Sequence, residues 1–191
     1  MSGQLRIING ATIRRLVPPE KLIGWMREAM IAVSRREVEL PLRRAIVLPG
    51  GMGAIGIMPG YVGAEANSAG VKLVSLVPPE RRKGSSHLGL MVLYDADGLV
   101  PEAILCGGTV TAIRTSAATA NATDLLARKD ATKLTILGSG EQAAAHIDAL
   151  RVVRPIDDVR IWGVNQDNAQ RLASKKGGRS CKTVEEALDG A

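Results

Sequence analysis

Hydrophobic positions along the N-terminal third of the chain predict a strand and then a helix. The apolar run Leu5-Arg-Ile-Ile8 is short enough for a strand. Pro18-Pro19-Glu20 then predicts the start of a helix, because proline is tolerated in the first helical turn. Apolar residues follow at helical spacing and indicate the core-facing stripe of that helix. These residues are Leu22, Met26, Ala29, Met30 and Val33.

Short β-rich runs replace the helical pattern from about residue 44 to residue 106. The sequence Asp95-Ala-Asp-Gly98 is a turn by composition, and it joins the last two runs as a hairpin. We therefore expect a mixed or antiparallel sheet, and residues 1–108 are predicted to form an α+β domain. The predicted strands are 45–48, 54–58, 71–77, 88–94 and 100–106.

An alanine-rich helix and an alternating β-α-β-α pattern follow. Residues 109–130 are predicted to form a connecting helix, with Thr109 as its N-cap. Residues 131–191 then predict parallel strands with helical crossovers. The expected elements are a strand at 133–137, a helix at 141–153, a strand at 159–162, a helix at 168–176 and a further segment at 181–184. The predicted fold class is α/β: an α+β domain followed by an incomplete Rossmann-type parallel domain.

The sequence Gly138-Ser-Gly-Glu-Gln-Ala143 lies where the first of these strands passes into the first helix. In a dinucleotide-binding turn, Gly138 would permit the tight bend and Gly140 would let a pyrophosphate approach the backbone. Ala143 is small enough for close packing of helix against strand. The helix N-terminus would offer N–H groups to the phosphates. This context predicts a nicotinamide dinucleotide site, and a glycine turn without a ligand is the alternative.

The second strand of this pattern bears on the choice between NAD and NADP. It ends in Trp162-Gly163-Val164-Asn165, without the acid that binds the adenosine ribose of NAD. Arg160, Arg171 and Lys175 are cations that could hold a 2′-phosphate. The sequence therefore favours NADP and leaves NAD open, with Asn165 as a further candidate cofactor contact.

Three cations stand in apolar surroundings, where a charge is costly unless it meets an anion or water. Lys72 lies inside a predicted strand, Arg114 lies inside the predicted connecting helix, and Arg43 precedes the first β-rich run. An arginine fork suits both oxygens of a carboxylate. These residues are candidates for binding an anionic substrate, and a lysine that points outward from an edge strand is the ordinary alternative.

Composition excludes several other classes of function. The formal net charge is +6, but the basic residues are scattered, and only two Trp, two Tyr and no Phe could stack on bases. This argues against a nucleic-acid partner. No apolar run approaches the roughly 18 residues of a membrane span. Cys106 and Cys181 are far apart and no metal-ligand spacing occurs, so we expect a cytoplasmic protein with reduced thiols and no metal site.

Five motifs occur in order along the chain: Met58-Pro-Gly-Tyr61, Gly70-Val-Lys-Leu-Val74, Leu93-Tyr-Asp-Ala-Asp-Gly98, Thr111-Ala-Ile-Arg-Thr-Ser-Ala-Ala118 and Gly138-Ser-Gly-Glu-Gln-Ala143. In order and spacing they resemble the ornithine cyclodeaminase/mu-crystallin family. This family includes cyclodeaminases, ketimine or cyclic-imine reductases and some alanine dehydrogenases. The resemblance implies an NAD(P)-dependent protein with a small amino- or imino-acid substrate. It also implies a homodimer with a substrate-binding and dimerisation domain beside a Rossmann domain.

The same resemblance implies roles for individual residues. Arg43, Lys72 and Arg114 match the positions that hold the substrate carboxylate. Thr115 and Ser116 match positions near the cofactor phosphates. The pyrophosphate turn would comprise Gly138, Ser139, Gly140, Glu141 and Gln142.

The chain departs from the family pattern at two points. Gly56 stands where strict ornithine cyclodeaminases carry a glutamate, which favours the reductase and mu-crystallin side of the family. Family members also continue beyond residue 191 and supply the catalytic aspartate of the cyclodeaminases there. We therefore expect either a fragment of a longer gene or an inactive paralogue. A non-catalytic, mu-crystallin-like protein that binds a nucleotide or a small ligand is the alternative function.

Overall fold

The computed structural model describes residues 4–63, 66–81 and 87–190. These residues form two compact units. The first comprises Met1–Val17 and Glu28–Thr111, and the second comprises Pro18–Arg27 and Ala112–Ala191. The boundaries differ from the expected division at residue 108, because the first part of an N-terminal helix joins the second unit.

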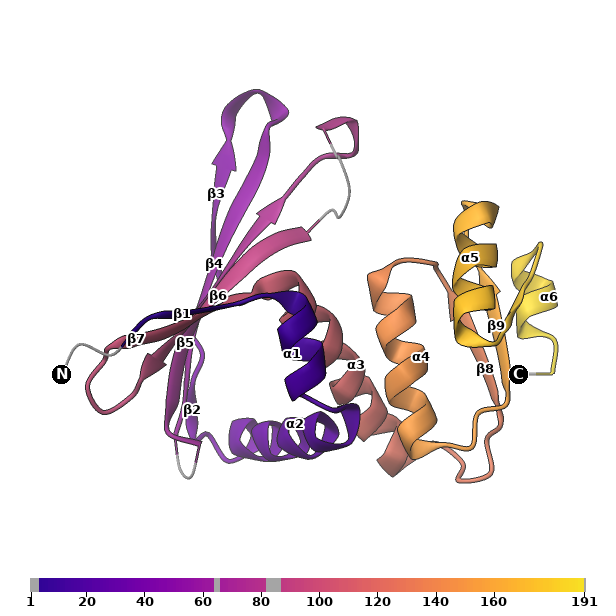
Figure 1. The fold of residues 1–191 in the computed structure, drawn as a ribbon, viewed down its shortest axis with the longest axis horizontal. Coiled ribbons are helices and arrows are strands. Elements are labelled where there is room, and N and C mark those ends of the chain that lie inside the picture. Colours follow the sequence, from indigo (N-terminus) through magenta and orange to yellow (C-terminus); the bar gives the residue numbers. More distant parts are fainter. Residues whose placement is uncertain (1–3, 64–65, 82–86, 191) are drawn as a thin grey trace. The chain divides into compact units, whose positions relative to one another are not determined.

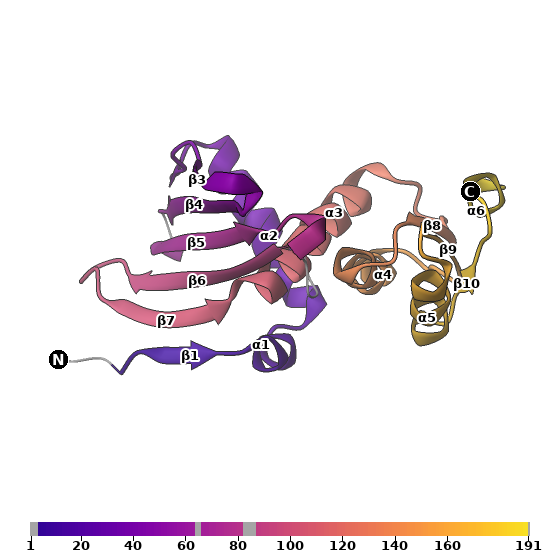
Figure 2. The ribbon, with the colours of Figure 1, turned by 90° about the horizontal axis from the view of Figure 1, so that it is seen from above.

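The first unit is built on one mixed sheet, in which seven strands are described. Its hydrogen-bonded order is β1-β7-β6-β5-β4-β2, and β3 also pairs with β4 (Figure 2). The β1–β7 pair is parallel and the other pairs are antiparallel. The antiparallel meander confirms the prediction from the β-rich runs. The strands are β1 (Arg6–Ile8), β2 (Val38–Glu39), β3 (Arg44–Leu48), β4 (Gly53–Val62), β5 (Ser68–Leu76), β6 (His87–Asp95) and β7 (Pro101–Cys106).

Helix α1 (Gly10–Leu16) was not expected from the hydrophobic pattern. The Asn9 side chain caps it by accepting a hydrogen bond from the Thr12 amide at 2.9 Å. Gly10 lets Thr109 approach closely, since a Cβ at position 10 would lie 2.3 Å from the Thr109 Oγ1 atom. Thr109 is therefore a buried contact inside its helix, not the predicted N-cap.

The second unit contains a three-stranded parallel sheet in the order β10-β9-β8 (Figure 2). Figure 1 shows β8 and β9 together with helices α4, α5 and α6 of this unit. Strand β8 and helix α4 have the bounds expected from the sequence. The parallel strands and helical crossovers confirm the Rossmann-type prediction. The elements are β8 (Lys133–Leu137), α4 (Glu141–Val153), β9 (Asp158–Trp162), α5 (Gln166–Lys176), β10 (Arg179–Ser180) and α6 (Val184–Leu188).

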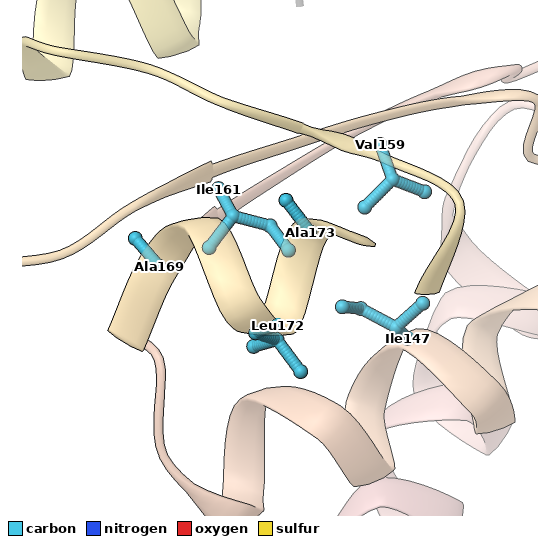
Figure 3. Packing of buried hydrophobic residues seen from close by; sticks show 6 residues of the cluster. All are labelled: Ile147, Val159, Ile161, Ala169, Leu172 and Ala173. Carbon is cyan, nitrogen blue, oxygen red and sulfur yellow. The ribbon is translucent and has the colours of Figure 1, made fainter. Parts of the chain in front are cut away.

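The core of the second unit lies between β9 and helices α4 and α5. Val159 and Ile161 extend from the strand toward the helices, and Ile147 approaches them from α4 (Figure 3). Residues Ala169 and Ala173 of α5 are completely buried, and their small side chains allow the helix to lie close to the strand. This packing holds β9 and the start of α5 in place beside the glycine turn that follows β8.

Two longer helices, α2 (Pro19–Ser34) and α3 (Gly107–Leu126), contribute to a second core cluster. Ile23 of α2 packs with Ala117 and Ala120 of α3, and with Ala149 and Leu150 of α4. This contact explains why the first part of α2 belongs to the second unit.

Candidate functional site

The turn between β8 and α4 has the backbone conformation that its glycines allow. Gly138 has φ of 134°, a value that favours glycine over other residues. Its amide donates a 2.7 Å hydrogen bond to the Trp162 carbonyl, which ties the turn to the end of β9. Gly140 is the N-cap of α4, in an extended conformation and without a side-chain capping hydrogen bond. The first turn of α4 therefore presents its N-terminus without a side-chain cap.

Space beside this turn is open. A Cβ atom built on Gly138 or Gly140 would meet no other atom within 4 Å. A cavity of about 320 Å³ adjoins the turn. Its lining residues are Thr135, Ile136, Leu137, Gly138, Gly140, Gln142, Ala143 and His146. An exposed glycine backbone at a helix N-terminus fits a pyrophosphate, because N–H groups and the helix dipole both favour an anion there.

Gly163 supports the turn from the neighbouring strand. A Cβ atom at this position would lie 3.1 Å from the Ser139 Oγ atom and 3.6 Å from the Ala169 Cβ. Ser139 of the predicted pyrophosphate turn therefore packs against the residue that follows β9. A glycine after the strand is the one sequence signal for this contact, because Ser139 and Gly163 are far apart along the chain.

Helix α3 brings the Thr119 hydroxyl to His146 of α4, one of the residues that line the cavity. Thr119 Oγ1 lies 3.1 Å from the His146 Nε2 atom, and His146 Nδ1 lies 2.7 Å from the Gln142 carbonyl. Since a carbonyl only accepts, Nδ1 carries the proton in this contact. Ser116 is buried, and its hydroxyl donates to the Ile113 carbonyl at 2.9 Å. Thr115 is half-buried on the same helix.

Two residues at or near the end of β9 that were candidates for contact with the cofactor's ribose have partners within the protein. Asn165 is the N-cap of α5, and its side chain accepts a hydrogen bond from the Asn168 amide at 2.9 Å. Arg160 is buried and pairs with Asp158 at 2.8 Å, so it does not face solvent as a cation available to a 2′-phosphate. The same Arg160 hydrogen bond holds the pKa of Asp158 below its usual value.

Two of the predicted substrate cations lie in the first unit. Lys72 of β5 pairs with Met58 of β4. Arg43 directly precedes β3, whose first residue, Arg44, pairs with Ile57 of β4.

The surroundings of the three predicted substrate cations differ. Arg43 is exposed, whereas Lys72 is half-buried between the register partners Met58 and Met91. Arg114 belongs to the second unit, where it is exposed on α3.

Comparison with known proteins identifies relatives over nearly the whole chain. The model of the ornithine cyclodeaminase/mu-crystallin family matches residues 10–191. Ketimine reductase mu-crystallin of Mus musculus is 33% identical over 154 residues, which are 79% of this chain and 49% of the mouse protein. The chain thus spans about half the length of the curated relatives it matches.

Solved structures give the same result for the fold. Thermococcus litoralis Δ1-pyrroline-2-carboxylate reductase, in complex with NADH and L-proline, has a TM-score of 0.88 and 29% identity. The match covers 97% of this chain and 59% of that one. An archaeal alanine dehydrogenase dimer with bound NAD has a TM-score of 0.84 and 25% identity, over 96% of this chain and 57% of the dehydrogenase chain. Across the described ranges, no helix is both long and apolar enough to cross a membrane.

Proposed function

This chain belongs to the ornithine cyclodeaminase/mu-crystallin family, and from that premise we propose that it serves an NAD(P)-dependent reaction of a small amino or imino acid. The reaction is that of a ketimine or cyclic-imine reductase, or of a cyclodeaminase. The observation that carries the proposal is the open glycine turn at Gly138 and Gly140, before a helix without a side-chain cap. That arrangement suits the pyrophosphate of a nicotinamide dinucleotide.

The chain's own residues have two tasks toward the cofactor in this proposal. Backbone N–H groups from Ser139 to Gln142 bind the pyrophosphate, and the 134° φ of Gly138 keeps the turn tight. Thr115 and Ser116 are assigned to the approach to the phosphates from α3, and the Ser116 hydroxyl is oriented by its hydrogen bond to the Ile113 carbonyl. When bound, the nicotinamide cofactor supplies or accepts the hydride.

Substrate binding is assigned to Arg43, Lys72 and Arg114. The sheet supports this assignment, because Lys72 pairs with Met58 of β4, and Arg43 is next to Arg44, which pairs with the neighbouring Ile57. Two nearby cations can hold both oxygens of a carboxylate. Met58 and Met91 flank Lys72 in the register and offer adaptable apolar surface to the rest of a small substrate. Imine reduction requires the substrate carbon to be held still, and a fixed carboxylate does this.

Gly56 supports reduction over ornithine cyclisation. This glycine is buried in β4, and a Cβ atom there would lie 3.1 Å from the Val74 Cγ1 atom. A glutamate at this position would therefore require Val74 to move. The pyrroline-2-carboxylate reductase that resembles this chain was solved with L-proline, the product expected of a cyclic-imine reductase.

A homodimer is part of the proposal. Strand β3 is paired only with β4 among the described strands, and its Ile46 and Val47 side chains are 58% and 79% exposed. These residues point to opposite faces of the sheet, so β3 is open on both faces. An exposed apolar edge strand is a natural site for association with a second copy. The alanine dehydrogenase that resembles this chain is a dimer.

The first test is a titration of the purified protein with NADPH and NADH, followed by nicotinamide fluorescence. In Gly140→Asp, a carboxylate occupies the space that the pyrophosphate would fill. The open surroundings of Gly140 allow this variant to fold. Gly24→Asp is the matched control, because it adds the same charge at another open position, in α2. Saturable binding that is lost only in Gly140→Asp supports the site.

Activity with Δ1-pyrroline-2-carboxylate and with ornithine then separates the reaction classes. Reduction of the imine supports the reductase, and ammonia release from ornithine supports the cyclodeaminase. Nucleotide binding without either activity supports the alternative of a binding protein. If neither wild type nor control binds nicotinamide nucleotides at millimolar concentration, the proposed function is wrong.

A further inference from the structure

The carboxyl end of β9 is the place where a Rossmann domain meets the adenosine ribose. Here that end continues as Gly163, Val164 and Asn165. The Val164 side chain is 92% exposed, so an apolar residue stands in solvent at this position. A bound adenosine would cover it, which is consistent with a ligand at this end of the strand.

The local packing disfavours the carboxylate that would bind a 2′-hydroxyl. Gly163 directly follows β9, and any side chain there would press on Ser139, 3.1 Å from the Cβ position. The next residues are apolar Val164 and the N-cap Asn165, whose oxygen already accepts the Asn168 amide. NAD recognition by an acid at the strand end is therefore not built into this segment.

Arg160, Lys175 and Arg171 are the three candidate cations for a 2′-phosphate, and their positions differ. Arg160 is buried against Asp158 and also donates to the Asp189 carbonyl. Lys175 lies in the last turn of α5, about 6 Å further along the helix axis than Arg171. Arg171 is exposed, and its guanidinium donates to the Asn168 side chain in the first turn of α5.

We propose that Arg171 binds the 2′-phosphate of NADP and so determines the cofactor preference of this site. The inference rests on the proposed nucleotide-binding function. Asn165 caps α5 through Asn168, and Asn168 in turn holds the Arg171 guanidinium back toward the β9 end. Helical side chains lean toward the N-terminus, so this direction is also the intrinsic one. A guanidinium there meets a phosphate with paired N–H donors.

One acidic residue opposes this assignment. Asp167 lies in the first turn of α5, where a carboxylate could instead bind a ribose hydroxyl of NAD. It precedes Asn168 by one residue, so its side chain projects about 100° away around the helix from the Asn168–Arg171 face. The preference for NADP therefore depends on which of Asp167 and Arg171 reaches the ribose.

The experiment compares dissociation constants for NADPH and NADH in wild type, Arg171→Gln, Arg171→Lys and the control Lys175→Gln. We expect Arg171→Gln to weaken NADPH binding about tenfold, as for a lost hydrogen bond to a charged group, and to leave NADH binding unchanged. Arg171→Lys retains part of the preference, because the charge remains without the fork. Lys175→Gln changes neither constant.

Several outcomes would overturn the proposal. An unchanged NADPH-to-NADH ratio in Arg171→Gln refutes it, as does equal weakening of both nucleotides. Tighter binding of NADH than of NADPH by wild type, abolished in Asp167→Asn, assigns the ribose to Asp167 instead. If wild type binds neither nucleotide, the proposed nucleotide-binding function itself is wrong, and this outcome is distinct from the failure of Arg171 as the specificity residue.

Discussion

Replacing Arg154 tests how helix α3 is anchored in the second unit. The Arg154 side chain is 2% exposed, and its guanidinium lies at the C-terminal end of α3. It donates to the carbonyls of Thr123, Asp124, Ala127 and Arg128 at 2.6 to 3.0 Å. It also meets the Asp124 carboxylate at 3.2 Å. The last carbonyls of a helix have no partners within the helix, so one buried arginine satisfies several of them.

The magnitude follows from what Arg154→Met would leave behind. A buried polar group without a partner costs about 1–3 kcal/mol. The Asp124 carboxylate is 31% exposed and keeps Arg27 and Lys129 as partners, so the loss comes mainly from the helix carbonyls. Residues Leu125 to Arg128 are exposed, so water can replace part of the lost hydrogen bonding. We therefore expect Arg154→Met to lower the free energy of unfolding by about 3 kcal/mol.

Urea unfolding followed by tryptophan fluorescence measures this loss in the relevant unit. Both tryptophans, Trp25 and Trp162, belong to the second unit. Arg151→Met is the matched control, because Arg151 is an exposed residue of α4, three residues before Arg154, and donates a 2.7 Å hydrogen bond to the Lys176 carbonyl. The control should lose less than about 1 kcal/mol. Equal losses in the two variants would refute the anchoring role of Arg154.

Three further predictions concern stability. Hydrogen bonds from nearby cations, of which Lys129 contributes most, hold the pKa of Asp124 well below its usual range. The ionised Asp124 therefore stabilises the fold fully above about pH 4, and this stabilisation is lost as pH falls toward the folded pKa. The urea midpoint of Asp124→Asn should consequently fall less than that of wild type between about pH 5 and pH 2.5. Gly107→Ala puts a Cβ 2.7 Å from the Gly89 carbonyl carbon and should destabilise the first unit by about 2 kcal/mol, measured by far-ultraviolet circular dichroism. Ile161→Ala empties a completely buried site and should cost about 2–5 kcal/mol by tryptophan fluorescence.

Local pattern was enough to predict the β8-turn-α4 segment. The strand at 133–137 and the helix at 141–153 have the predicted bounds in the structure. Here the signals agree with one another: an apolar run ends at a glycine, and good helix formers follow the second glycine. The antiparallel strands were also predicted in order, because each run is bounded by turn residues.

Position within an element was harder to predict than the element itself. Arg160 lies in a predicted strand, but sequence does not reveal that its face is covered and that Asp158, two residues earlier on the same face, neutralises it. Asn165 was expected to contact the cofactor, and the structure gives it the additional task of capping α5. Helix α1 was missed because seven residues carry too little periodicity, although Asn9 is a recognisable cap.

The candidate nucleotide site shows why a short glycine motif is insufficient evidence of a working turn. Gly138 supplies the φ of 134°, but its amide is tied to Trp162, and Ser139 rests against Gly163. Both contacts come from the end of β9, which is held in register with β8 by five residue pairs. The same end leads into the cap that places Asn168 and Arg171. The proposed phosphate turn and the proposed ribose contact thus both adjoin one strand end. We therefore predict that a change that shifts β9 alters affinity for the pyrophosphate and cofactor preference together.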